Sequence, residues 1–175
     1  MSTGALPNRA DLRKLATQNA NVSARVKLSA LPRVVQVVES EEAEIDVELA
    51  FRRDEQGLYV IDGEITGRLA MVCQRCLDAV TLDVKSDFNL AVVWDDEAAK
   101  QVPTYLEPLV ASAEPFDLHV LVEDELLLSL PFSPYHDEKD CHGGEYQQQQ
   151  STVVEPVAPK RENPFAVLDQ LKRKD

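Results

Sequence analysis

The chain has 175 residues, of which 44% are hydrophobic, so it is long enough for one domain with a real core and some tail. It contains no apolar run of membrane-spanning length, and its first residues lack the build of a signal peptide, so we expect a cytoplasmic protein. Three cysteines, two of them only three positions apart, exclude the disulfide framework of a secreted domain and fit a reducing compartment.

Acidic groups outnumber basic groups by 31 to 18, and the resulting net charge of -13 is unevenly distributed. Residues 1–33 carry a local charge of +5 and residues 160–175 carry +2, so the middle of the chain carries -20. A domain with so much negative charge repels phosphate backbones, which argues against nonspecific nucleic-acid binding by the whole surface. The basic ends remain able to contact RNA, and the plain alternative is that the acidic groups keep the protein soluble.

The N-terminal segment, residues 1–33, is basic and contains one predicted helix. Leu12, Leu15 and Ala16 recur at helical spacing with basic residues opposite, which predicts a short amphipathic helix. The β-branched run at 34–38 follows, and we interpret it as a short strand, although Val-rich runs of this length fit a helix as well.

Residues 34–142 are predicted to form a single α+β domain that begins with a β-sheet. Apolar and polar residues alternate with the two-residue period of a strand, and turn residues such as Asp62-Gly63 separate the segments. The pattern predicts an antiparallel sheet or small barrel of about five to six strands, and the absence of helical crossovers excludes a parallel sheet. The predicted strand segments lie at 44–51, 58–61, 64–72, 80–84 and 88–94.

A helix is predicted over residues 118–130, because Asp117 can cap its start and Pro131 stops it. The segment is apolar around most of its circumference, so it should cover the sheet as a second layer. We interpret the acidic triplet at 123–125 as a solvated edge of this helix, and contact with a basic partner is the alternative.

The C-terminal part of the chain predicts a tether and a docking helix. Residues 143–162 include a glutamine run and two prolines, which predicts a disordered linker. Residues 163–175 predict an amphipathic helix that docks either on a partner or back on its own domain. The residues assigned to partner binding are Asn163, Pro164, Phe165, Leu168, Leu171, Lys172, Arg173 and Lys174.

Two short-spaced pairs have the composition of zinc ligands. Cys73 and Cys76 stand at the tip of a predicted hairpin, and His136 and Cys141 stand in the loop that follows the long helix. Together they supply a tetrahedral site for zinc, provided that the helix returns this loop to the hairpin tip. His142 is a poorer fourth ligand than His136, because it follows Cys141 directly. The alternative, that these are ordinary turn thiols and a loop histidine, stays open here.

Enzymatic chemistry has little support in the sequence. A thioredoxin-type pair needs a helix that begins at its first cysteine, whereas a strand is predicted after Cys76. The sequence contains no motif of a phosphate-binding loop, a nucleophile elbow or a zinc-protease helix. We therefore expect no catalytic activity, and a thiol redox protein that uses Cys73 and Cys76 is kept as an alternative.

Four stretches, in this order, resemble the YceD family of large ribosomal RNA subunit accumulation proteins. They are Val72–Leu77, Val122–Pro131, Pro134–Asp137 with Cys141, and Asn163–Leu168 with the basic residues after it. The resemblance implies a cytoplasmic, non-catalytic bacterial factor that supports synthesis, processing or stability of 23S ribosomal RNA and large-subunit assembly. It implies a ribosomal precursor, or a ribosomal or processing protein, as the partner, and direct RNA binding through the basic N-terminal segment is the alternative.

Overall fold

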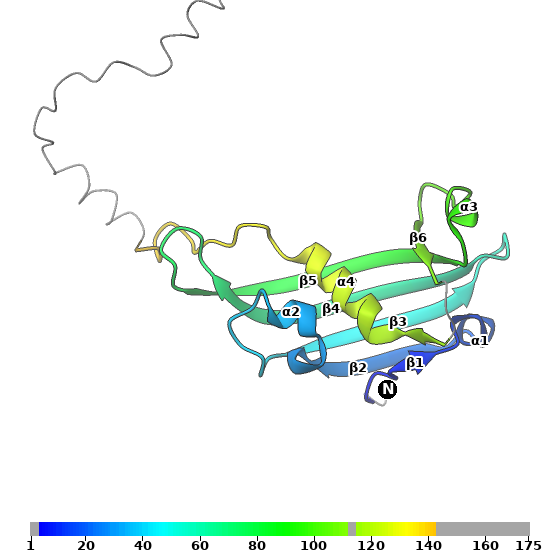
Figure 1. Ribbon diagram of the computed structural model, residues 1–175, viewed down its shortest axis with the longest axis horizontal. Helices are drawn as coiled ribbons and strands as arrows, with labels where there is room; N and C mark the ends of the chain where they lie inside the picture. The colour runs from blue at the N-terminus through cyan, green and yellow to red at the C-terminus, as the bar shows by residue number, and fades with distance from the viewer. Residues whose placement is uncertain (1–3, 112–114, 143–175) are drawn as a thin grey trace, which may run out of the picture.

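Figure 1 shows a computed structural model of the chain, which describes residues 4–111 and 115–142. The linker predicted at 143–162 and the docking helix predicted at 163–175 lie outside these ranges. No helix within the described ranges is long and apolar enough to cross a membrane.

The fold is organised around an open sheet of five strands in the spatial order β2-β3-β4-β5-β6. Neighbouring strands are antiparallel except for β5 and β6, which are parallel, so the sheet is mixed. The predicted α+β class is confirmed, and the sheet is open rather than closed into a barrel. The parallel β5–β6 pair corrects the prediction that the sheet is antiparallel throughout. The strands are β2 (Asn21–Lys27), β3 (Glu44–Arg53), β4 (Tyr59–Val72), β5 (Ala79–Val93) and β6 (Glu107–Val110), and β1 (Arg9–Ala10) pairs separately with β7 (Phe116–Asp117).

Strands β4 and β5 form a long hairpin that ends at the two neighbouring cysteines. The turn predicted at Asp62-Gly63 is wrong, because β4 runs straight through it. A Cβ atom on Gly63 would lie 2.1 Å from the ring of Phe88, the residue opposite it on β5. The glycine therefore makes room for an aromatic ring above the sheet and does not turn the chain.

Two further features of the N-terminal half were not predicted. Strand β2 pairs along its whole length with β3, and its apolar residues Val22, Ala24 and Val26 alternate with polar ones at the two-residue period of a strand, so the sequence did carry the signal. The strand predicted at 34–38 is wrong: this region begins with helix α2 (Pro32–Val35), which follows a 3-10 turn at Leu28–Ala30. Pro32 stands at the first turn of α2, where its fixed φ angle favours a helix and its missing N–H breaks no hydrogen bond.

Helices cover one face of the sheet and leave most of the other face open. The predicted long helix is confirmed as α4 (Leu118–Ser129), which packs against β5, and the Asp117 side chain caps it by accepting from the His119 amide at 2.9 Å. Helix α1 (Leu12–Thr17), also as predicted, packs against β3 and β4. Among the described residues, the opposite face carries only the connection from β5 to β6, with the short helix α3 (Asp96–Ala99), at one end of the sheet.

The interpretation of the acidic triplet on α4 as a solvated edge is wrong for Glu123, whose residue is only 4% exposed. Its carboxylate accepts the backbone N–H of Arg33 at 2.5 Å and that of Val34 at 3.4 Å, so α4 caps the start of α2. Asp124 forms an ion pair with the Arg33 guanidinium at the surface. A partly buried Glu125 completes the triplet, and its burial raises the pKa of its carboxyl.

We expect Glu123→Ala to lower the free energy of unfolding by about 2–3 kcal/mol, because it leaves two amides at the start of α2 without their acceptor. Asp124→Ala removes only a solvent-exposed ion pair and should cost less than about 1 kcal/mol. Urea denaturation of both variants measures the difference, and equal losses would contradict the capping role of Glu123.

Candidate metal centre

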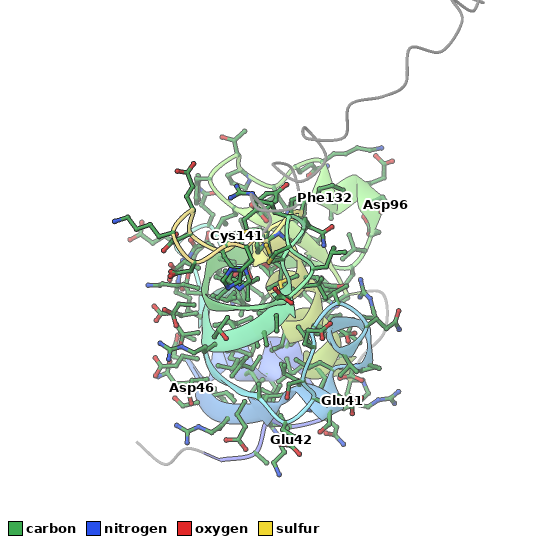
Figure 2. All side chains as sticks on the ribbon, turned by 90° about the vertical axis from the view of Figure 1, so that its left-hand side faces the viewer. Glu41, Glu42, Asp46, Asp96, Phe132 and Cys141 are labelled. Carbon is green, nitrogen blue, oxygen red and sulfur yellow. The ribbon has the colours of Figure 1, made fainter. Side chains whose placement is uncertain are left out.

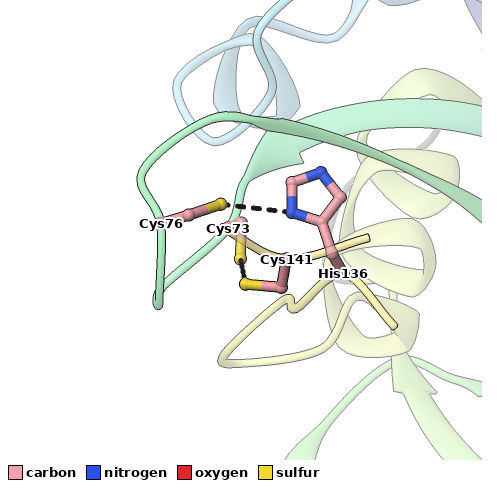
Figure 3. A group of neighbouring side chains, drawn as sticks. All are labelled: Cys73, Cys76, His136 and Cys141. Atoms are coloured by element: carbon pink, nitrogen blue, oxygen red, sulfur yellow. Dashed lines mark hydrogen bonds between the residues drawn. The ribbon is translucent and has the colours of Figure 1, made fainter. Parts of the chain in front are cut away.

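The hairpin tip and the loop after α4 bring four potential metal ligands together (Figure 3). The ligand atoms of Cys73, Cys76, His136 and Cys141 all lie within 4.8 Å of one another. The Cys73 and Cys141 sulfurs are 3.9 Å apart, and the Cys76 sulfur is 3.3 Å from Nδ1 of His136. The geometric condition set by the sequence, that the loop return to the hairpin tip, is therefore met.

One backbone hydrogen bond joins the loop to the hairpin tip, and a second closes the tip itself. The Gln74 amide donates to the Pro134 carbonyl at 2.9 Å, and the Cys73 amide donates to the Asp78 carbonyl at 2.9 Å. Residues 74–76 form a turn, and no helix begins at Cys73. The thioredoxin arrangement, in which a helix dipole activates the first thiol, is therefore absent from this part of the structure.

His136 is oriented as a ligand. Its Nε2 atom lies 3.0 Å from the carbonyl oxygen of Ala79, which only accepts hydrogen bonds, so Nε2 carries the proton. The other nitrogen, Nδ1, then presents its lone pair toward Cys76. A carbonyl on the far nitrogen is the usual outer partner of a metal-bound histidine, because it fixes the ring and its tautomer.

The surroundings favour charge on one thiol in particular. Burial of Cys73 opposes its ionisation, but backbone N–H groups of Cys76, His136 and Arg75 donate to its sulfur and lower the pKa of the thiol to about 5. The Asp78 amide favours a thiolate at Cys76, but burial and the neighbouring sulfurs outweigh it and raise the pKa of that thiol to about 11. Negative charge shared among close sulfurs is stabilised by a bound cation.

Three sulfurs and one imidazole nitrogen suit zinc. Zinc binds thiolates at about 2.3 Å and imidazole at about 2.0–2.1 Å, so the ligand atoms of a tetrahedral site lie roughly 3.5–3.8 Å apart. The distances of 3.9 and 3.3 Å between ligand atoms bracket that range. The donor set fits a zinc ion with small adjustments of side chains.

A small apolar cluster supports the centre from below. Met71, Cys73 and Val80 are buried in it, and Val38 and Leu130 pack against them. Its buried members are distinct from those of the main core under α4, and Val38 and Leu130 pack against both clusters. The ligands are therefore anchored on both sides, by the hairpin and by the chain that leaves the helix.

The structure brings together all four ligands that the sequence suggested, and His142 is not among them. The predicted partner-binding residues at 163–174 lie outside the described ranges. Sequence reasoning missed Leu77, which adopts a left-handed backbone conformation with a φ of 66° directly after the second cysteine. The conformation lets the chain turn back into β5, and only a glycine or asparagine there would have signalled it.

We expect Leu77→Gly to raise the free energy of unfolding by about 0.5–1 kcal/mol, because the left-handed conformation is strained for leucine and 72% of the residue is exposed. Leu77→Val should lower it by about 1 kcal/mol, because a β-branched side chain fits this conformation worst. Urea denaturation measures both free energies of unfolding. If the turn were unstrained, the two variants would change the free energy of unfolding in the same direction.

The chain is similar to known proteins over most of its length. The family model described as "Large ribosomal RNA subunit accumulation protein YceD" matches residues 61–172, which contain all four ligands. A protein of Haemophilus influenzae named large ribosomal RNA subunit accumulation protein YceD is 32% identical over 145 residues, covering 82% of this chain and 83% of the relative. No solved structure gives a significant match.

Proposed function

Because this chain belongs to the YceD family of large ribosomal RNA subunit accumulation proteins, we propose that it supports accumulation of 23S ribosomal RNA and large-subunit assembly without catalysing a reaction. Its direct partner is a basic ribosomal or processing protein, and contact with the RNA is indirect. The observation that carries the choice of partner is a row of carboxylates on the open face of the sheet.

The carboxylate row crosses three strands. Glu48 lies directly opposite Glu64, and Glu64 lies directly opposite Asp87. The row lines an open hollow of about 700 Å³, formed only by residues of β2, β3, β4 and β5. Like charges directly opposite each other destabilise a sheet, so this arrangement costs stability in the isolated protein.

The cations near the hollow do not neutralise it. Lys85 lies 3.3 Å from carboxylate oxygens of both Glu64 and Asp87, while Glu48 has no ion-pair partner among the described residues. Asp62, at the edge of the hollow, is paired with Arg52, and that hydrogen bond lowers the pKa of its carboxyl. A basic segment laid across the hollow would supply the missing positive charge.

The basic N-terminal segment is a weaker candidate for direct RNA binding, because half of its six cations are engaged within the protein. Arg25 pairs with Asp46 at 2.9 Å, Arg33 pairs with Asp124, and the Arg13 guanidinium lies 3.8 Å from the centre of the Trp94 ring. Direct RNA contact would require these groups to exchange their partners for phosphates.

In this proposal the zinc is structural. Three thiols and one histidine complete a tetrahedron and leave no open position for substrate or water, unlike the zinc site of an enzyme. The bound ion would hold the hairpin tip and the loop after α4 in one arrangement. The thiols are then ligands rather than a redox couple.

Glu48→Lys tests the acidic face. The new lysine lies opposite Glu64 on the neighbouring strand, so the free energy of unfolding should stay the same or rise by less than about 1 kcal/mol. Co-sedimentation with large-subunit precursors in sucrose gradients should nevertheless fall. Glu55→Lys makes the same charge change at an exposed turn outside the hollow and serves as the control. Equal co-sedimentation of the two variants would contradict the proposed contact.

His136→Ala and His142→Ala form a matched pair for the zinc site. We expect about one zinc ion per chain in the purified protein, retained by His142→Ala and largely lost by His136→Ala, because only His136 faces the thiols. Metal content measured by mass spectrometry decides the point. Loss of zinc from both variants, or from neither, would contradict the assignment of the fourth ligand.

A further inference from the structure

The end of the molecule that carries the metal centre exposes an unusual amount of apolar surface. The described residues expose eight large apolar side chains, and four of them lie on this end: Leu77, Leu128, Phe132 and Tyr135. Phe132 is fully exposed, and Leu77 and Leu128 are 72% and 77% exposed. Isolated apolar residues on a surface are ordinary, but several at one place mark a site of interaction. We call these four residues the apolar end surface.

Contacts join the hairpin tip, which carries Leu77, to the loop that carries Tyr135 and, three residues before it, Phe132. The Gln74 amide is bonded to the Pro134 carbonyl, and the Arg75 guanidinium lies over the Tyr135 ring at 5.4 Å, so the hairpin tip and the loop meet here. Leu128 lies on the last turn of α4, just before Leu130, which packs beneath the metal centre. Figure 2 looks onto this end and shows Phe132 and Cys141 on it together.

One of the four residues, Leu77, has a strained backbone conformation. Leu77 holds a left-handed conformation that leucine rarely adopts, and its side chain gains little contact within the described structure. Strained residues persist where the surrounding structure or a binding function requires them. An exposed leucine in this conformation is understandable if another segment packs against it.

The rim of the apolar end surface is acidic. The charged residues of the hairpin tip, the loop after α4 and the loop after α2 comprise seven acids against two bases. The acids are Glu39, Glu41, Glu42, Asp78, Asp137, Glu138 and Asp140, and the bases are Arg75 and Lys139. The Glu39 amide donates to the Ala70 carbonyl at 2.8 Å, which places the start of the loop after α2 beside the end of β4. A matching segment would present apolar side chains in its middle and basic groups beside them.

The chain itself contains such a segment close by. Phe165, Leu168 and Leu171 recur every three residues, and the basic triplet 172–174 follows them directly. The described structure ends at His142, next to the ligand Cys141 and therefore at this same end of the molecule. The 20 residues between 143 and 162 would span roughly 25 Å as a flexible coil, enough to return to the surface.

We propose that residues 163–174 of the same chain cover the apolar end surface in the free protein. The intervening residues hold the segment at an effective concentration on the order of millimolar, so even a weak contact is largely formed. The inference goes beyond the proposed function, because it concerns the isolated protein. In an assembly, a partner must displace this segment before it can use the surface, or capture the segment and thereby uncover it.

Nuclear magnetic resonance of the full-length, zinc-loaded protein tests the proposal. Phe165→Ser with Leu168→Ser should shift the backbone amide signals of residues 75–78 and 130–142, and Phe132→Ser should shift those of 163–171. Ala166→Ser is the control, because position 166 falls on the opposite side of a helical segment from Leu168 and should move neither set.

Amide signals of 75–78 and 130–142 that stay unchanged in the double variant would overturn the proposal. Shifts confined to the open sheet face around Glu48 and Glu64 would also overturn it, since the segment would then rest on the acidic hollow. Shifts that depend on protein concentration would show that the contact joins two copies of the chain. None of these results requires a ribosomal partner, so the proposal can fail while the proposed function stands.

Discussion

The structure depends on one contact, that between the tip of the β4–β5 hairpin and the loop after α4. The two segments meet through the Gln74–Pro134 hydrogen bond, the His136–Ala79 hydrogen bond and the convergence of three sulfurs with one imidazole. The contact fixes the far end of α4 over the sheet, while the buried carboxylate of Glu123 fixes α2 against the same helix. A zinc ion in this position would bind only the folded arrangement and would therefore add its binding energy to the stability of the fold.

The molecule separates stability from recognition. The face beneath α1 and α4 holds the main core, and small sheets with helices on one side are a common way to bury such a core. The open face keeps three carboxylates in a row, and the end with the candidate metal centre exposes apolar groups and a strained Leu77 within the described residues. The carboxylate row and the strained backbone of Leu77 both lower the stability of the protein, and local departures of this kind are expected where a protein meets its partners.

The sequence predicted the features that depend on short-range pattern. Alternation in β3 and β5, the capped apolar helix α4 and the pairing of Cys73-Cys76 with His136-Cys141 are each visible in a few residues. The structure confirms the strand pattern, although segments 80–84 and 88–94 form one strand rather than two, and it confirms the helix and the proximity of the four side chains. The sequence did not reveal features that depend on residues far away along the chain. Gly63 resembles a turn glycine until the Phe88 ring is placed above it, and Glu123 resembles a surface acid until α2, 90 residues away, supplies its two amides. The parallel pairing of β6 follows from the path of the β5–β6 connection, which no local pattern encodes.

The account rests on the claim that this end of the fold is closed by a metal bound to three sulfurs and one nitrogen. Zinc X-ray absorption spectroscopy of the purified full-length protein measures that coordination directly. The account predicts three sulfur ligands at about 2.3 Å and one nitrogen at about 2.0–2.1 Å. A shell made only of oxygen and nitrogen, a shell with fewer than three sulfurs, or a protein that retains no zinc would contradict it.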